Sequence, residues 1–193
     1  QAEDGIRDVL ERSSARETTM RVALGSVCRK LLEDLGITVG SRVIQIHDVK
    51  DETPISPDIS PEALNKQADK SPVRCLDKQA EFAMMKSIDD AKENGDSVGG
   101  IFEVVATGLP YGLGTYTQWH QKLQARISGL MMSVNAFKGI EIGSGFSGGT
   151  QFGSEVHDEI GWDGEKYIRH SNNAGGIEGG MSNAQAIVLR MAM

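Results

Sequence analysis

The stretch VGGIFEVVATGL, residues 98–109, decides the fold class of this 193-residue chain. Its β-branched and aromatic residues predict a strand, and the turn-forming residues ENGDS stand directly before it. A helical pattern of apolar residues lies on each side of this strand. Helices and strands are therefore expected to alternate around it.

The N-terminal part of the chain predicts a helix followed by a strand. Apolar residues from Met20 to Leu35 recur at three- and four-residue steps, as on one face of a helix. This helix is predicted to begin near Ser13 or Ser14 and to end at the glycine after Leu35. The run ITVGSRVIQIHDV, residues 37–49, then predicts a strand.

A proline-rich excursion, residues 50–71, separates this strand from the next helix. Its prolines disfavour a strand, so we expect it to be partly mobile or partly helical. Ser71 followed by Pro72 is typical of a helix N-terminus. We therefore predict a second helix from this pair to a break at Gly95.

The residues after the central strand predict one more helix and two more strands. The run TYTQWHQKLQARISGLMM, residues 115–132, has one apolar helical face, made by Trp119, Leu123, Ile127, Leu130 and Met131. Strands are predicted at 134–143 and 184–193, with a glycine-rich loop region at 144–180. This order predicts a single core domain over residues 1–193, an α/β or α+β sandwich with helices packed on sheets.

The composition excludes several classes of protein. A net charge of −7 argues against a general nucleic-acid binder, which needs an excess of clustered Lys and Arg. No apolar run is long enough for a membrane span and no charged-then-apolar leader is visible, so we expect neither a membrane span nor an export signal. It begins with Gln1 and stops at Met193 inside a strand-like run, so we expect a fragment of a longer protein.

Neither a metal site nor a catalytic set is predicted. Cys28 and Cys75 lie in helical apolar patterns without metal-ligand spacing, so we expect buried, reduced thiols. The histidines also have no metal-ligand spacing and no obvious partner; they are His47, His120, His157 and His170. The spacing around Gly145–Gly149 does not match a nucleophile elbow.

The segment ERSSAR, residues 11–16, allows two interpretations. If a helix begins here, its free N–H groups, the Ser13 and Ser14 hydroxyls, and the Arg12 and Arg16 guanidinium groups form a site for a phosphate or carboxylate. The alternative is an ordinary Ser14 N-cap with a capping-box glutamate three residues later and two solvated arginines. The residues alone leave both open.

Two further segments are candidates for ligand contact. The run SNNAGGIEGGMSNAQ, residues 171–185, allows close approach of the backbone to a ligand, but taken alone its glycines favour the alternative of a mobile loop. It does not match a dinucleotide fingerprint. Residues 135–137, NAF, offer a side-chain amide where a helix meets a strand, and a plain turn is the alternative.

Taken in order, five motifs make the chain resemble the chorismate synthases. They are ERSSARETTMRVALGSV, SPVRCLDKQA, ENGDSVGGIFEVVATGLPYGLG, MMSVNAFKGIEIGSGF and NNAGGIEGGMSNAQAIVLRMAM. The resemblance implies an α+β fold, a layered sandwich of helices between mostly antiparallel sheets, assembled as a homotetramer in the cytoplasm. It also implies conversion of 5-enolpyruvylshikimate 3-phosphate to chorismate and phosphate, a step of aromatic amino-acid biosynthesis that needs reduced FMN and is associated with NADP.

The resemblance assigns site residues only where the motifs match. Contacts to FMN are expected from Arg12, Ser13, Ser14, Asn135, Ala136 and Gly179. Arg16 is expected to face the anionic substrate. The family's essential histidines, its later flavin-binding segment and its acidic residue have no counterpart in this chain, so the fragment is expected to be inactive. A non-catalytic module that binds flavin or a phosphorylated ligand, and a purely structural domain, are the alternatives.

Overall fold

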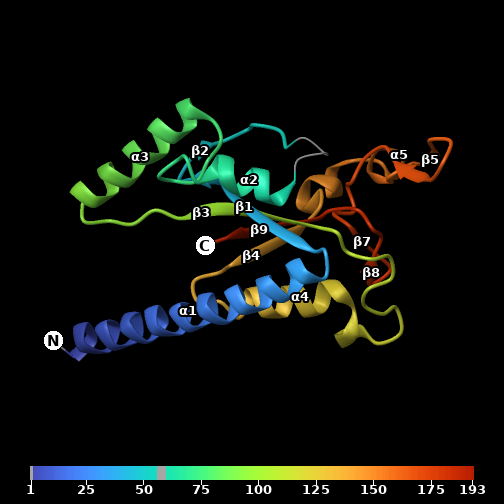
Figure 1. The fold of residues 1–193 in the computed structure, drawn as a ribbon. Helices are drawn as coiled ribbons and strands as arrows, with labels where there is room; N and C mark the ends of the chain where they lie inside the picture. The colour runs from blue at the N-terminus through green and yellow to red at the C-terminus, as the bar shows by residue number, and fades with distance from the viewer. Residues whose placement is uncertain (1, 56–59) are drawn as a thin grey trace.

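The structure is a computed structural model that describes residues 2–55 and 60–193, with side chains described from residue 16 onward within these ranges. Its centre is a five-stranded sheet in the order β2-β1-β3-β9-β4, in which every neighbouring pair is antiparallel (Figure 1). The bounds are β1 Thr38–Ile46, β2 Val49–Lys50, β3 Gly100–Thr107, β4 Gly139–Ile142 and β9 Ile187–Ala192. The predicted α+β class with mostly antiparallel strands is confirmed.

Four longer helices accompany the sheet, and shorter elements fill the C-terminal third. The helices are α1 Ala2–Asp34, α2 Pro61–Ala68, α3 Lys78–Glu93 and α4 Leu123–Met132. The shorter elements are η1 Trp119–Gln121, η2 Gly145–Thr150, α5 Gly153–Val156, β5 Ile160–Trp162, β6 Tyr167–Arg169, β7 Ile177–Glu178 and β8 Met181–Ser182. In Figure 1, α1 and α4 lie on the opposite side of the view from α2 and α3. In the described part of the chain, no helix combines the length and apolar character that a membrane span requires.

The main hydrophobic core lies between α4 and one face of the sheet. Burial alternates along β9, so that Ile187, Leu189 and Met191 are buried on this face. They pack with Phe102 and Val104 of β3. From α4, the packed side chains are Leu123, Ile127 and Met131. The opposite face of β3 and β9 carries Glu103, Val105 and Arg190, and it is this face that forms a cleft.

The apolar face predicted for the third helix is only partly correct. The helix begins at Leu123 instead of near residue 115, because η1 and a turn precede it. Trp119 therefore lies outside the helix and is 77% exposed, and Leu130 is 68% exposed. Sequence periodicity placed Trp119 on the same helical face because it continued one helical phase through Lys122, where the chain changes direction. Leu130 lies within α4 but does not pack against the core with Leu123, Ile127 and Met131.

The predicted start of the first helix is wrong. Helix α1 begins at Ala2, and its first turn carries Glu3 and Asp4, acidic residues that suit the positive end of a helix. Residues 13 and 14 therefore lie inside the helix, where backbone N–H groups bond to carbonyls four residues earlier. Neither a helix-end anion site nor a Ser14 cap can form there. The side chains of Arg12, Ser13 and Ser14 lie outside the described residues.

The predicted start of the second helix is also displaced. The pair Ser60–Pro61 begins α2, and the Ser60 side chain accepts a hydrogen bond from the Ala63 N–H. The excursion is thus partly helical, as expected. Helix α3 begins only at Lys78, where Asp77 is the N-cap and accepts from the Ala80 N–H at 2.7 Å.

The pair Ser71–Pro72, where the second helix was predicted to begin, makes a turn instead. The Ser71 hydroxyl accepts from the Val73 N–H, and Arg74 then adopts a left-handed backbone conformation with φ of 58°. This conformation interrupts any helix from Pro72. Among the cysteines, Cys75 is buried beside this turn, as expected, and burial raises the pKa of its thiol. Cys28 is exposed on α1, so its predicted burial is wrong; both thiols are free.

Candidate functional site

The segment that follows α4 is held against α1 by charged hydrogen bonds. Glu17 Oε1 accepts from Arg21 Nη2 at 2.6 Å and Nε at 3.0 Å, one helical turn further along α1. Glu17 Oε2 accepts from Asn135 Nδ2 at 3.1 Å. Arg21 also donates to Ser133, through Nη1 to the hydroxyl at 3.1 Å and through Nη2 to the carbonyl at 3.2 Å. The part of α1 that directly follows the expected ligand segment 11–16 therefore contacts residues 133–135.

The charge on Glu17 is favoured by these contacts. The hydrogen bond from Arg21 and then that from Asn135 lower the pKa of the Glu17 carboxyl below its ordinary value. Glu17 is thus ionised at neutral pH, which keeps both of its oxygens as acceptors. Its role differs from the capping box that the sequence allowed. Arg16, the neighbouring residue, is exposed.

Residues 135 and 136 form a tight turn between the end of α4 and β4. Ala136 has a φ of 71°, a left-handed conformation that residues other than glycine seldom adopt. The Phe137 N–H closes the turn on the Val134 carbonyl at 3.3 Å. The Phe137 ring then packs into the core, with its centre 5.3 Å from that of Phe102. The turn is therefore fixed on both sides, by Phe137 and by α1.

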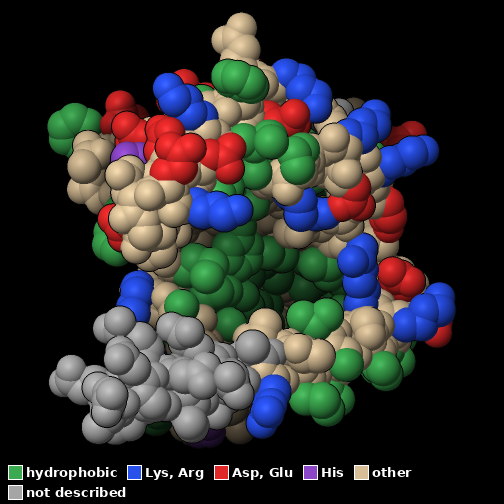
Figure 2. All heavy atoms as spheres, turned by 90° about the vertical axis from the view of Figure 1, so that its left-hand side faces the viewer, with side chains coloured by type: hydrophobic (Ala, Val, Ile, Leu, Met, Phe, Trp, Pro, Cys, Tyr) green, Lys and Arg blue, Asp and Glu red, His purple; other side chains and the backbone are tan. Residues whose placement is uncertain are grey.

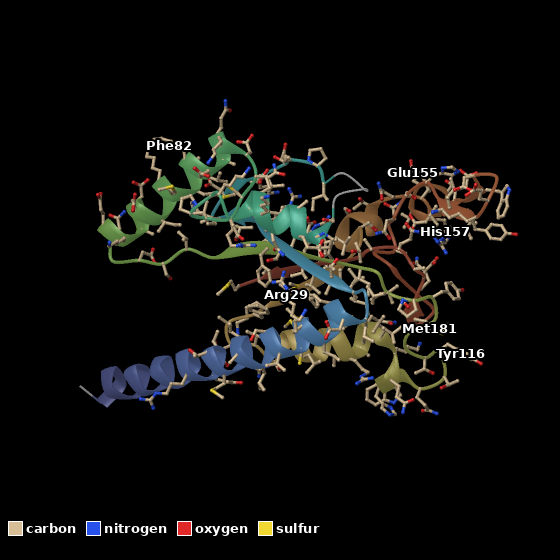
Figure 3. The ribbon with its side chains drawn as sticks, viewed as in Figure 1. Arg29, Phe82, Tyr116, Glu155, His157 and Met181 are labelled. Carbon is tan, nitrogen blue, oxygen red and sulfur yellow. The ribbon has the colours of Figure 1, made fainter. Side chains whose placement is uncertain are left out.

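Gly179 lies at the other end of α4. It belongs to the tight connection between β7 and β8, with a φ of 59°, and a Cβ there would meet open space. The next residue, Gly180, accepts the Leu123 N–H through its carbonyl at 2.8 Å, at the start of α4. Because α4 runs from Leu123 to Met132, about 15 Å of helix separates Gly179 from the Asn135 turn. Figure 3 shows Met181 and Tyr116 together at this end of the molecule.

A cleft of about 610 Å³ lies on the sheet face opposite the main core, away from the residues assigned by resemblance. Its floor holds a bridging carboxylate: Glu103 accepts from Arg42 Nε at 3.0 Å and from Arg190 Nε at 2.9 Å. Arg42 and Glu103 are 6% and 3% exposed. The register of the strands places these three charged residues in one row across the sheet, because Glu103 lies opposite Arg42 on β1 and opposite Arg190 on β9.

Two buried aspartates brace the cleft walls. Asp51 accepts from the Thr53 and Leu76 N–H groups at 3.0 and 2.6 Å, and Asp158 accepts from the Asn173 and Ala174 N–H groups at 2.6 and 2.9 Å. Burial alone raises the pKa of each carboxyl, but hydrogen bonds to the charged form outweigh burial, so both pKa values are lowered. The glycine-rich region is thus organised around Asp158.

Sequence reasoning did not find this cleft. The available signal was a charged residue within each of two otherwise apolar strands. Glu103 interrupts the apolar run of β3, and Arg190 interrupts that of β9. The five charged residues that line it are two arginines and three acids, namely Arg42, Arg190, Asp51, Glu52 and Glu103. With this mixed charge, the cleft favours neither anions nor cations. Among the described residues, no group of three or more His, Cys, Asp or Glu side chains is placed to bind a metal ion.

The fold and these sites define an α+β protein in which a long helix presents polar residues to a turn at the end of a second helix. The family model described as chorismate synthase matches residues 2–193. The chain belongs to the chorismate synthase family.

Individual relatives agree with this assignment. "Chorismate synthase 2" of a Bacillus cereus strain is 53% identical over 189 residues, which cover 97% of this chain and 48% of the relative. "Chorismate synthase 1" of Bacillus thuringiensis strain Al Hakam is also 53% identical over 189 residues, with the same coverage. The chain thus spans about half the length of the curated relatives that it matches.

A solved structure supports the fold directly. The structure titled "Crystal Structure of Chorismate Synthase" superposes with a TM-score of 0.85 at 45% sequence identity. The match covers 93% of this chain and 56% of the solved chain. Agreement at this level extends the family relationship from sequence to three-dimensional arrangement.

Proposed function

We propose that this chain is the core of a chorismate synthase, a carbon–oxygen lyase of aromatic amino-acid biosynthesis. The reaction would convert 5-enolpyruvylshikimate 3-phosphate to chorismate by 1,4-elimination, in which the bond to phosphate breaks, a ring proton leaves and no net oxidation occurs. The family match over residues 2–193 supports this function. The contact between Glu17 and Asn135 is the structural observation that carries it, because it holds the Asn135–Ala136 turn against α1 next to Arg16, the residue expected to face the substrate.

The described residues fit one side of a site for reduced FMN. The exposed Asn135–Ala136 turn offers backbone groups and a side-chain amide, and Arg16 places an exposed cation on the neighbouring helix. Bound reduced FMN would supply electron density for the departure of phosphate. Arg16 would bind the anionic substrate, and the turn would orient the flavin. Gly179 would contact the cofactor from the far end of α4, with Arg12, Ser13 and Ser14 contributing from α1.

We expect the chain to lack turnover by itself, because the acid and base groups of the family have no counterpart in its motifs. Chorismate formation should stay at the level of a protein-free control when the chain is mixed with substrate and reduced FMN. Turnover by the purified chain, verified by mass, would contradict this expectation. Assembly as a homotetramer, a cytoplasmic location and a link to NADP are part of the same proposal.

Cofactor binding is tested by titrating oxidised FMN with the chain and following flavin fluorescence. We expect saturable binding that Asn135→Ala and Gly179→Val weaken, while Asn94→Ala, at the exposed end of α3, leaves it unchanged. Addition of 5-enolpyruvylshikimate 3-phosphate should tighten binding, and Arg16→Gln should remove that effect. Binding without any response to the substrate would favour the non-catalytic flavin module, and no binding would argue against a flavin site within this chain.

A further inference from the structure

The end of α4 depends on α1 for its positive charge. Cations stabilise the C-terminal end of a helix, where carbonyl groups lack partners, but the last turn of α4 contains no basic residue. Arg21 supplies the cation from α1, since it donates to both the carbonyl and the hydroxyl of Ser133, the C-cap of α4. The Ser133 hydroxyl also donates to the Leu130 carbonyl at 2.6 Å. The helix end is therefore completed in trans by another element.

Glu17 makes this arrangement specific. Its Oε1 holds Arg21 through both Nε and Nη2, and its Oε2 accepts from Asn135 two residues beyond the helix cap. Three side chains thus link α1 to both ends of the segment 133–135. We refer to Glu17, Arg21 and Asn135 as the α1 clamp.

The turn beyond the clamp needs external support. The left-handed conformation of Ala136 is unfavourable for an alanine and persists only where its surroundings fix it. Phe137 fixes the turn on the core side. The clamp is the matching restraint on the side of α1, and it acts on the residue directly before Ala136.

We propose that Glu17 is a positioning residue, which fixes the Asn135–Ala136 turn in the conformation that receives the flavin. Glu17 itself uses both oxygens within the protein, so it acts through Arg21 and Asn135 and not by contact with the cofactor. This inference rests on the proposed function, because the flavin is its ligand. It adds a residue that neither the comparisons nor the motif assignments mark as part of the site.

The test uses the 193-residue chain with three single variants and one double variant, Glu17→Gln with Arg21→Gln. Glu17→Gln keeps an acceptor for Asn135 but removes the charge that holds Arg21, and Arg21→Gln removes the cation. Glu33→Gln is the matched control, because Glu33 on the same helix also pairs one turn away, with Arg29 at 3.5 Å. Arg29 is labelled on α1 in Figure 3.

Two measurements are made on each variant: amide hydrogen exchange at residues 134–137, and the Kd for oxidised FMN. We expect Glu17→Gln and Arg21→Gln each to accelerate exchange in this segment and to raise the Kd about tenfold, the loss of one charged hydrogen-bond network. The double variant should raise the Kd no further than the single variant with the larger effect, because the two residues act as a unit. Glu33→Gln should change neither measurement.

The outcomes separate this inference from the proposed function. Unchanged exchange in Glu17→Gln would overturn the clamp, whatever the FMN affinity. Faster exchange with an unchanged Kd would show a structural clamp and overturn its role in flavin positioning. Absence of FMN binding by the unsubstituted chain would overturn the proposed function and with it the flavin role, while the exchange data would still decide whether the clamp exists.

Discussion

A buried charged residue with partners on two neighbouring strands has a large influence on stability. Glu103 is the clearest example, since each of its carboxylate oxygens serves one arginine on a neighbouring strand. Arg42 is 6% exposed and depends on Glu103 and the Thr53 carbonyl. Removing a partner from a buried ion pair leaves an uncompensated charge, which costs far more than an exposed pair contributes.

Replacement of Glu103 by Gln is therefore expected to lower the free energy of unfolding by about 3 to 5 kcal/mol. Arg190→Gln should cost less, because Arg190 is one-third exposed and Glu103 keeps Arg42 as a partner. Urea denaturation followed by circular dichroism measures both, with exposed Glu93→Gln on α3 as the control. Equal stability of Glu103→Gln and the control would show that the ion pairs of Glu103 with Arg42 and Arg190 make no net contribution to the free energy of unfolding.

Acid sensitivity is expected from Asp158. Its pKa is lowered in the folded chain, so the folded state binds a proton at lower pH than the unfolded state does. The stabilisation is thus fully present above the ordinary Asp pKa of about 3.9 and is lost as pH falls through the lower folded value. Urea midpoints measured from pH 7 to pH 3 should fall at the acid end.

Asp158→Asn should be about 1 to 3 kcal/mol less stable than the unsubstituted chain at pH 7 and should lose less on acidification. Asp89→Asn, at an exposed position on α3, is the control and should keep the full acid dependence. An unaltered pH profile in Asp158→Asn would assign the acid sensitivity to other carboxyls, Asp51 first among them.

At this scale the sequence identified residue types but not their partners. Asn135 was predicted as an available side-chain amide, and the structure gives that amide a partner on α1. Glu17 was considered only as a local cap, although it pairs with Arg21 one turn along the helix and with Asn135, which is 118 positions away. Contacts over such separations leave no local pattern, so the link from Glu17 to Asn135 and the pairing of Glu103 with Arg42 and Arg190 could not be predicted, whereas the spacing of Glu17 and Arg21 is a local helical pattern.

At the scale of elements, helix starts are decided by which cap makes its hydrogen bond. Three Ser–Pro pairs occur in the sequence. Of the two that lie within the described residues, Ser60–Pro61 begins a helix and Ser71–Pro72 does not. Asp77 was not considered, although its carboxylate accepts the Ala80 N–H at 2.7 Å and completes the first turn of α3. A local motif therefore predicts that a helix begins nearby more reliably than it predicts the residue at which the helix begins.

Asp77→Ala should destabilise the chain by about 1 kcal/mol through loss of this cap. The control is Asp90→Ala, which removes an exposed carboxylate from the interior of α3 and should change stability by less than about 0.5 kcal/mol. Thermal unfolding of both variants decides the point. Equal melting temperatures of the two variants would show that the Asp77 cap does not contribute to stability.

The strands were predicted better than the ends of the helices. All four strands predicted from β-branched runs occur, because alternating burial leaves a strong signal, as along β9. Their bounds are shorter than predicted, since Val134 to Lys138 form a turn instead of strand. The short hairpin β5–β6 in the glycine-rich region escaped prediction because three-residue strands carry too little periodicity.

At the scale of the molecule, hydrophobic surface is left uncovered. An apolar groove of about 280 Å³ is lined by side chains of β1, β3 and α3, and Met193 lies at its edge. Figure 2 shows hydrophobic side chains gathered in a hollow on the side of the molecule that it views. Several apolar residues of α1 are also exposed, among them Leu24 at 63% and Leu31 at 62%. Surface of this kind marks association sites.

The purified chain is therefore expected to self-associate and to bind a hydrophobic dye. Leu24→Glu with Leu31→Glu should reduce both, with a change in the free energy of unfolding below about 0.5 kcal/mol, because neither side chain is buried. Size-exclusion chromatography with light scattering and dye fluorescence provide the measurements. Ala23→Glu, beside Leu24 on the same helix, is a control for added charge alone. Unchanged association in the double variant would exclude α1 as the contact surface.

The position of β9 between β3 and β4 has a consequence for synthesis on the ribosome. β4 pairs with β9 in this sheet, yet β9 follows it by more than 40 residues. At ordinary translation rates the nascent chain would hold β4 without that neighbour for roughly 2 to 9 seconds. During this interval the newly made strands present open edges, so chaperone contact is expected to concentrate there. Slower codons between residues 143 and 186 would lengthen that exposure without changing the finished protein.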